Sequence, residues 1–263
     1  MGIVVITIPG TAKRAFAQAL YERTGGGVDL VIVQKPKNRT PLLRFTRFYR
    51  SVGWRNLLPE IWYAILLRLN RRAEHSLSLV REHTPPRNFN TQNPPKVLEV
   101  DSVNSSEVQK ALKTLAPDLL VIWGSAVISP DILRLAKVAI NLHMGVCPKY
   151  RGAVANHFAL LRGDLENIGA TIHYVVEKVD AGNILLGIRA DTRKPPRELF
   201  RELNDSAYAF YLDIAHKLYR GERLPETPQN IANGENFKLS QWTPRRRLQA
   251  ARKIQKWEQS FDR

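Results

Sequence analysis

The sequence predicts an α/β fold built on an open, mostly parallel sheet. Short apolar runs of strand length recur along the 263 residues, and stretches with helical periodicity separate most of them. Glycine or proline closes several of these runs, as at Pro9-Gly10 and at Gly124. Strands that alternate with helices favour parallel strands joined by right-handed crossovers.

The elements follow from these patterns in chain order. The apolar run at residues 3–8 is expected to be a buried strand, a helix follows to about Arg23, and the three glycines at 25–27 end it. The later strands are expected at residues 28–34, 97–100, 118–124, 138–143, 170–176 and 184–190, and the later helices at 105–115, 130–136, 153–162 and about 197–219. Ligands of open α/β sheets bind beyond the carboxyl ends of the strands, so the functional site is expected there.

Two segments depart from this alternation. Residues 38–83 are expected to form a helical insertion in which aromatic residues and leucines are interleaved with arginines, and residues 84–96 form a proline-rich loop. Such helices either pack their apolar side on the domain or lie on a membrane surface. The polar tail ends in a basic helical segment at 245–257. We therefore predict a main domain at residues 1–220, which contains the insertion, and a basic C-terminal extension at 221–263.

The formal net charge of +16 is concentrated in these two segments. Residues 35–75 hold ten Lys and Arg against two Glu, and residues 238–263 hold eight against two acidic residues, so together they carry 14 of the 16 excess charges. A local positive field attracts polyanions such as nucleotides, nucleic acid or an acidic membrane surface. The alternative interpretation is a solvated surface that keeps the protein soluble.

The remaining composition is that of an ordinary globular protein, with 44% hydrophobic and 24% charged residues. Cys147 is the single cysteine, which excludes a disulfide framework within the chain and fits a reducing compartment. No apolar stretch reaches the roughly 18 residues that a membrane span needs. The first apolar run also has no preceding basic segment or cleavage-like site, so we interpret it as a strand and not as a signal peptide. The expected location is the cytoplasm, with a peripheral position at the inner membrane surface left open.

The residues with the clearest chemistry lie between positions 139 and 182. Asn141 and His143 are two apart at the end of an expected strand, so both side chains point to the same face. An amide can donate a hydrogen bond to a developing oxyanion, and an imidazole can transfer a proton near neutral pH. Asp180 lies in a D-A-G turn that is placed to return a carboxylate to the strand ends, where it would favour a charged imidazole.

These residues belong to an ordered set of motifs. N-x-H at 141–143, P-x-Y-R-G at 148–152, G-D at 163–164, G-A-T-I-H at 169–173 and D-A-G at 180–182 follow one another. The order resembles the catalytic segment of the tetrahydrofolate-dependent formyltransferase family, which includes methionyl-tRNA, glycinamide ribonucleotide and sugar N-formyltransferases. The resemblance is specific over roughly residues 117–190 and extends loosely to the first two strands.

The resemblance implies a Rossmann-like catalytic domain that uses 10-formyltetrahydrofolate as donor and no metal. Its catalytic residues match Asn141, His143 and Asp180. By resemblance, Asn141 and the protonated His143 would stabilise the oxyanion formed when an amine attacks the formyl carbon, and Asp180 would set the charge of His143 and position a water that shuttles protons. The segments that match the folate contacts are Ser125, Ala126, Val127 and Ile128 after the fourth strand, and Val179 and Asp180 in the later loop.

The acceptor is less constrained than the donor. Many family members carry a serine and two leucines after the histidine, whereas residues 144–147 here are Met-Gly-Val-Cys, which weakens an assignment to the tRNA or purine subfamilies. Methionyl-tRNA formyltransferases also carry a further β-barrel domain, which the tail after Tyr219 is not expected to build. A small anionic acceptor such as an amino-sugar nucleotide is expected, with Tyr150 and Arg151 in contact with it. An arginine suits a phosphate or carboxylate, although Arg151 can equally pin its own loop.

The sequence is compatible with several alternatives. A non-catalytic scaffold, a binding module for nucleic acid or membrane on the same fold, and a methionyl-tRNA formyltransferase-like enzyme are the alternatives to the small-acceptor enzyme. Cys147 lies four residues after His143, but nothing in the sequence orients a Cys–His nucleophile. His157 and His173 could accompany His143 as metal ligands, but their spacing matches no ligand pattern, so we predict no metal.

Overall fold

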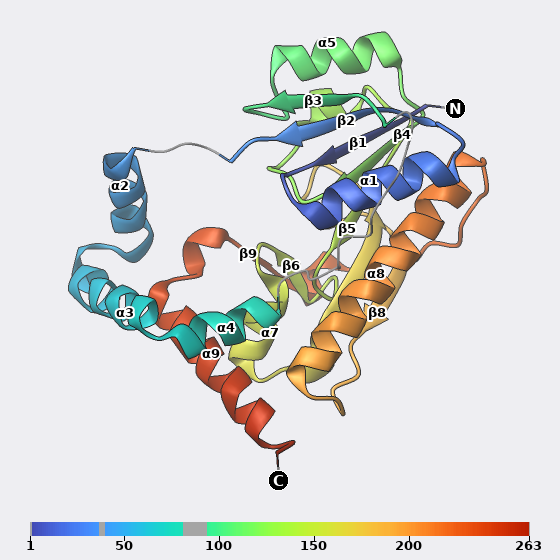
Figure 1. The fold of residues 1–263 in the computed structure, drawn as a ribbon. Coiled ribbons are helices and arrows are strands. Elements are labelled where there is room, and N and C mark those ends of the chain that lie inside the picture. Colours follow the sequence, from blue (N-terminus) through green and yellow to red (C-terminus); the bar gives the residue numbers. More distant parts are fainter. Residues whose placement is uncertain (1, 37–39, 81–93, 263) are drawn as a thin grey trace.

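The structure is a computed structural model that describes residues 2–36, 40–80 and 94–262. Seven strands form one sheet in the order β3-β2-β1-β4-β5-β7-β8 (Figure 1). Their bounds are β1 Ile3–Thr7, β2 Val28–Gln34, β3 Val97–Val100, β4 Leu119–Trp123, β5 Val138–His143, β7 Gly169–Tyr174 and β8 Ile184–Arg189. The first five of these strands are parallel, and β7 pairs antiparallel with both β5 and β8. The predicted mostly parallel α/β sheet is therefore confirmed.

Helices cover both faces of this sheet. α1 (Thr11–Arg23) and the long α8 (Pro196–Tyr219) lie side by side on one face, and α5 (Ser106–Leu115) and the short α6 (Pro130–Leu133) lie on the other (Figure 1). Because side chains alternate along a strand, β1 places Ile3 and Val5 in the core under α1 and α8, and Val4 and Ile6 in the second core. Burial on both faces is the reason why the first four residues of β1 are all apolar.

The sheet has a topological switch point between β1 and β4. These strands are parallel neighbours, yet the chain continues from β1 to β2 on one side and from β4 to β5 on the other. The turns that leave the two strands therefore diverge and leave a crevice at their carboxyl ends. β5 ends at the same edge of the sheet.

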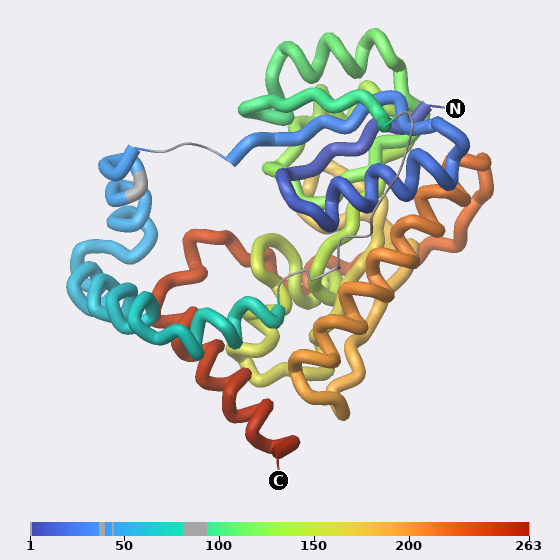
Figure 2. Tube along the Cα trace, in the orientation of Figure 1, coloured from blue at the N-terminus to red at the C-terminus, as the bar shows by residue number. Residues whose placement is uncertain are grey.

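Over its described residues, 40–80, the predicted helical insertion contains three α-helices, which project beside the sheet (Figure 2). They are α2 (Pro41–Val52), α3 (Leu57–Leu69) and α4 (Arg71–Leu79), and a short 3-10 turn at Trp54–Asn56 joins the first two. α3 and α4 pack on the C-terminal helix α9 (Pro244–Gln259), where Leu67, Leu77 and Ile254 are buried. The expected loop at 84–96 lies, up to residue 93, outside the described residues.

The C-terminal extension packs against the main domain. β9 (Glu235–Phe237) pairs in parallel with β6 (Tyr150–Gly152), and α9 also contacts α7 (Ala155–Arg162). The Phe237 ring stacks on Tyr150 and on Phe158, with centroid distances of 5.6 and 4.3 Å. The division into 1–220 and 221–263 remains a prediction, but the extension is in contact with the segment that carries the predicted site.

Candidate active site

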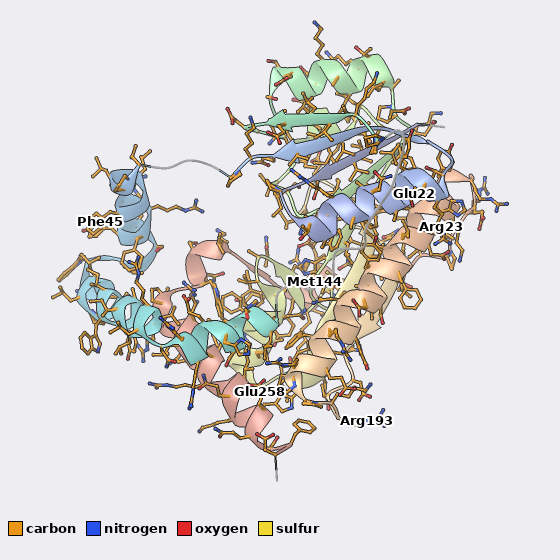
Figure 3. The ribbon with its side chains drawn as sticks, in the orientation of Figure 1. Glu22, Arg23, Phe45, Met144, Arg193 and Glu258 are labelled. Carbon is orange, nitrogen blue, oxygen red and sulfur yellow. The ribbon has the colours of Figure 1, made fainter. Side chains whose placement is uncertain are left out.

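A cavity of about 740 Å³ lies at the carboxyl ends of β1, β4 and β5. Its walls are formed by the turns that leave these strands, together with the β7–β8 loop and the segment that leads into α7. The lining is contributed by residues 8–13, 122–128, 141–144, 152–154, 156–157, 175–177 and 179–180, with Val80 and His173. The labelled Met144 lies in this central region, between the sheet and α4 (Figure 3). The cavity is therefore at the place where the topology predicts a ligand site.

Asn141 and His143 stand together at the end of β5. They are two residues apart on one strand, and both line the cavity. His143 is 7% exposed, so most of the imidazole is shielded from solvent. The antiparallel register of β5 with β7 places His173 directly opposite Asn141.

Asp180 joins these groups from the β7–β8 loop. Its Oδ2 is 3.2 Å from His143 Nδ1 and accepts a hydrogen bond of 2.8 Å from the Gly152 amide. Its Oδ1 is 3.3 Å from His173 Nε2 and accepts a hydrogen bond of 3.3 Å from Asn141 Nδ2. The structure thus brings together the three residues predicted to be catalytic, which are separated by up to 39 positions in the chain.

The site is arranged to keep Asp180 ionised. Burial by itself would raise the pKa of this carboxyl, but the charge of His143, the hydrogen bond to His173 and the Gly152 amide together lower the pKa below its usual range. His143 faces an acceptor on both sides, because its Nε2 is 2.8 Å from the Tyr150 carbonyl oxygen. Only a doubly protonated ring can donate to both partners, so the geometry suits an imidazolium–carboxylate pair.

Two side chains hold the loop that carries Asp180. Arg151 Nη1 donates to the Val179 carbonyl at 3.2 Å, and Gln229 Nε2 donates to the Asp180 carbonyl at 3.3 Å. These contacts hold Asp180 at φ 48°, a left-handed conformation that is uncommon outside glycine. Gly182 is also required, because a Cβ there would lie 1.9 Å from the Tyr174 carbonyl oxygen. Of the two roles considered for Arg151, the structure shows the contact that pins the loop.

Gly145 gives His143 the space for its second hydrogen bond. A Cβ at this position would lie 2.5 Å from His143 Nε2 and 2.8 Å from the Tyr150 carbonyl oxygen. Any side chain would therefore displace the imidazole or the carbonyl that it contacts. The glycine in the Met-Gly-Val-Cys segment thus takes part in shaping the site.

The predicted folate-contacting segment borders the cavity. Ser125, Ala126, Val127 and Ile128 all line it, as does Val179. Two polar side chains hold the segment: Gln34 Oε1 accepts from the Ala126 amide at 3.2 Å, and Asn104 Nδ2 donates to the Val127 carbonyl at 2.9 Å. Val127 is 66% exposed, which leaves its side chain available to a ligand.

Tyr150 lies away from the cavity. The side chain is 1% exposed, its ring stacks on Phe237, and its hydroxyl donates to Asp164 Oδ2 at 2.8 Å. Burial and the neighbouring Asp164 raise the pKa of this hydroxyl to about 12. The backbone carbonyl of Tyr150 contacts His143, and the contact of its side chain with an acceptor stays a prediction.

His173 lies within the cluster of Asn141 and Asp180, although the sequence did not predict it as a member of the catalytic group. It is 1% exposed, and its Nε2 is 3.2 Å from Asn141 Nδ2. The signal was present in the G-A-T-I-H motif, but the cross-strand register that pairs His173 with Asn141 cannot be obtained from one strand alone. Within the described residues, no group of three or more His, Cys, Asp and Glu side chains is arranged to hold a metal ion.

The environment of Cys147 does not favour a nucleophile. The thiol is buried, and burial together with the Asp180 carboxylate raises its pKa to about 12. A nucleophilic cysteine needs the opposite shift, toward the thiolate. Its amide instead donates to the Thr171 hydroxyl at 3.0 Å, which ties the loop after β5 to β7.

Comparison with known proteins agrees with this fold. The family model described as formyl transferase matches residues 67–206, which is just over half of the chain. The chain therefore belongs to the formyl transferase family. The match covers the strands from β3 to β8 and includes Asn141, His143, His173 and Asp180.

Curated relatives match about half of the chain. The methionyl-tRNA formyltransferase of Limosilactobacillus fermentum is 34% identical over 146 residues, which are 54% of this chain and 46% of that protein. The methionyl-tRNA formyltransferase of Syntrophus aciditrophicus is 32% identical over 150 residues, which are 56% of this chain and 46% of that protein. The chain thus matches about half the length of these relatives.

Solved structures of similar fold cover more of the chain at lower identity. A sugar N-formyltransferase from Shewanella superposes with a TM-score of 0.53 at 14% identity, covering 95% of this chain and 88% of that chain. A phosphoribosylglycinamide formyltransferase from Bacillus halodurans gives a TM-score of 0.52 at 20% identity, covering 84% of this chain and 97% of that chain. These superpositions establish the common fold.

Proposed function

We propose that this protein transfers a formyl group from 10-formyltetrahydrofolate to a primary amine. The observation that carries the proposal is the meeting of Asn141, His143 and Asp180 at the wall of one cavity. The Asp180 carboxylate lies 3.2 Å from the imidazole and 3.3 Å from the amide. An ionised carboxylate, an imidazolium and an amide donor are the groups that an acyl transfer through an oxyanion needs.

In the proposed reaction the acceptor nitrogen attacks the formyl carbon directly. A new C–N bond forms, the negative charge develops on the formyl oxygen, and the bond to the donor nitrogen then breaks. The acceptor nitrogen loses one proton and the departing nitrogen gains one. Asn141 and His143 stabilise the oxyanion, for which one of them must exchange an internal hydrogen bond for the substrate oxygen. Asp180 keeps His143 charged and orients the water that moves the proton.

The cavity suits the folate donor, which supplies the activated formyl group. Its volume of about 740 Å³ is within the usual range for small-molecule sites. Apolar side chains such as Val127, Ile128 and Val176 line it beside the polar catalytic groups. Apolar walls with a few convergent polar groups fit a flat heteroaromatic ring with hydrogen-bonding edges.

We assign a small, anionic amine such as an amino-sugar nucleotide as the acceptor. Lys13, at the start of α1, lines the cavity and would place a positive charge near a phosphate. The basic segments 35–75 and 238–263 are expected to contact a polyanion or an acidic membrane surface. The cytoplasm remains the predicted location.

A second acceptor class is favoured by one specific observation. The curated relatives that match residues of this chain at 32–34% identity are methionyl-tRNA formyltransferases. An aminoacyl-tRNA also presents a primary amine and a polyanionic backbone, which a strongly basic protein would attract. The donor chemistry and the catalytic residues would be the same.

A transfer assay tests the proposal. Purified protein is incubated with 10-formyltetrahydrofolate and, in parallel, an amino-sugar nucleotide, glycinamide ribonucleotide or methionyl-tRNA, and formylated product is measured by mass spectrometry. We expect product with the amino-sugar nucleotide and a loss of about 10²-fold or more in Asp180→Asn, a typical effect of removing one acid–base group. Product with methionyl-tRNA alone would select the second acceptor. Absence of product with every amine, together with no turnover of the donor, would contradict the proposed function.

A further inference from the structure

α3 has apolar side chains on two opposite faces. One face carries Leu67 and packs against α4 and α9. The other carries a stripe formed by Leu58, Trp62, Ile65 and Leu69, whose spacings of four, three and four residues place them in one row along the helix. These four side chains are 79%, 59%, 46% and 77% exposed. A stripe of this kind on a helix normally faces a partner.

α2 carries a second row of exposed apolar side chains. Leu42, Phe45 and Tyr49 recur at helical spacing on α2 and are exposed, and Trp54 in the short connection to α3 is 70% exposed. Figure 3 shows Phe45 on the side of α2 that points away from the sheet. These residues and the α3 stripe together form what we call the α2–α3 surface. The surface lies at the edge of the molecule, far from the long α8 (Figure 1).

The α2–α3 surface is strongly positive. Residues 40–70 contain five arginines and one acidic residue, Glu60. Glu60 is 7% exposed, and its carboxylate accepts a hydrogen bond from the Arg245 amide on α9, so it belongs to the packed side of α3. Arg55 lies with its guanidinium 5.2 Å from the centre of the Trp54 ring. Positive charge therefore accompanies the exposed apolar side chains without an exposed acidic residue between Thr40 and Asn70.

The combination of exposed apolar side chains and positive charge indicates which kind of partner binds the α2–α3 surface. Two copies of the chain that met through this surface would bring arginine against arginine, which opposes association. Exposed tryptophan and leucine with interleaved arginines are instead typical of helices that lie in the headgroup region of an anionic bilayer. The aromatic and leucine side chains would enter the acyl boundary, and the arginines would contact lipid phosphates.

We propose that the α2–α3 surface binds the surface of a membrane that contains anionic phospholipids. The chain lies on the bilayer through this surface, and none of its described helices is long and apolar enough to cross it. The membrane contact is made by α2 and α3. The basic helix α9 packs on the opposite face of α3, the face that carries Leu67. The membrane proposal does not depend on the formyl-transfer proposal, since it concerns a surface outside the cavity.

Vesicle sedimentation with the full-length protein tests this surface. The protein is mixed with large unilamellar vesicles of phosphatidylglycerol and phosphatidylcholine, or of phosphatidylcholine alone, at low and high salt. We expect sedimentation with the anionic vesicles that weakens at high salt, because exposed charges are screened. The Leu58→Ser/Trp62→Ser double variant should bind roughly tenfold more weakly or worse, since two inserted apolar side chains are lost.

Two further double variants test whether vesicle binding depends on the α2–α3 surface and on its arginines. Val97→Ser/Phe210→Ser removes apolar side chains that are 61% and 47% exposed elsewhere on the molecule, and it should bind like the wild type. Arg55→Gln/Arg68→Gln should lose the preference for anionic vesicles. Circular dichroism confirms that each variant is folded.

Equal loss of binding in both serine variants, or no binding of wild-type protein to anionic vesicles, would overturn the proposal. A wild-type dimer that Leu58→Ser/Trp62→Ser converts to a monomer, without vesicle binding, would also overturn it.

Discussion

At the scale of single residues, the site depends on an ion pair between buried groups. Asp180 and His143 are 3.2 Å apart with side-chain exposures of 12% and 8%, so neither charge is well solvated. Each compensates the desolvation of the other, and the Gly152 amide completes the arrangement. Changes that remove one partner or move the imidazole should therefore have measurable effects on both stability and transfer.

The lowered pKa of Asp180 predicts a specific dependence of stability on pH. A carboxyl whose pKa is depressed in the folded state stabilises the protein above its unfolded pKa of about 3.9, and this contribution is lost as the pH falls toward the folded value. The free energy of unfolding should therefore differ between wild type and Asp180→Asn at pH 6, and the difference should shrink below about pH 4. Urea unfolding of both proteins at several pH values measures this difference in the free energy of unfolding. A difference that stays constant down to pH 3 would contradict the ion pair.

Gly145→Ala should impair transfer through His143. The added Cβ would lie 2.5 Å from Nε2, so the imidazole must move from its contact with the Tyr150 carbonyl. We expect the rate of transfer to fall by about 10²-fold, as for other displaced acid–base groups. Gly187→Ala is the matched control, because a Cβ there meets no atom within 4 Å. Equal activity of the two variants would show that the position of His143 is unimportant.

Cys147 should react slowly with alkylating reagents. Burial and the Asp180 carboxylate raise the pKa of the thiol to about 12, so almost no thiolate exists at pH 8. The rate of reaction with iodoacetamide should be about a hundredfold lower in the native protein than in urea. Mass spectrometry follows the modification over time. Rapid labelling of Cys147 in the native protein would instead support the hypothesis that Cys147 and His143 form a Cys–His nucleophile.

At the scale of elements, the C-terminal extension supports the loop that contacts His143. Phe237 on β9 is 2% exposed and stacks on Tyr150, whose carbonyl faces the imidazole. Phe237→Ala should lower the free energy of unfolding by about 3–5 kcal/mol, the usual cost of a buried Phe truncation. Phe210→Ala, at a residue that is 47% exposed, should cost much less. Thermal or urea unfolding of both variants checks this, and equal small effects would show that the extension is only loosely attached.

The elements themselves were largely predictable. The bounds of β3 and β5 agree with the predicted strands at 97–100 and 138–143, because turn residues and apolar runs mark them sharply. α6 ends at Leu133, earlier than the predicted 136, because residues 134–136 continue as tight turns before β5. The pairing of β6 with β9 was not predictable, since it joins segments more than 80 residues apart and neither has a strong strand pattern.

At the scale of the whole molecule, chain topology explains which residues of the site cluster could be predicted from the sequence and which could not. Asn141, His143 and Asp180 were accessible to sequence reasoning because they lie in ordered motifs at expected strand ends. His173 was not predicted to join them, since its place in the cluster comes from the antiparallel register that sets it opposite Asn141. The burial of Tyr150 was also hidden, because Phe237, which covers its ring, comes from the distant extension.

The most direct test of the account is calorimetric titration with 5-formyltetrahydrofolate, a stable analogue of the proposed donor. Wild-type protein is compared with Val127→Arg, at a residue that lines the cavity, and with Val97→Arg, at an exposed valine on β3 outside it. We predict one saturable site in the wild type and in Val97→Arg, and binding at least about tenfold weaker in Val127→Arg because the larger charged side chain fills the apolar wall. Equal affinity in all three proteins, or no binding by folded wild-type protein, would contradict a folate site at the carboxyl ends of β1, β4 and β5.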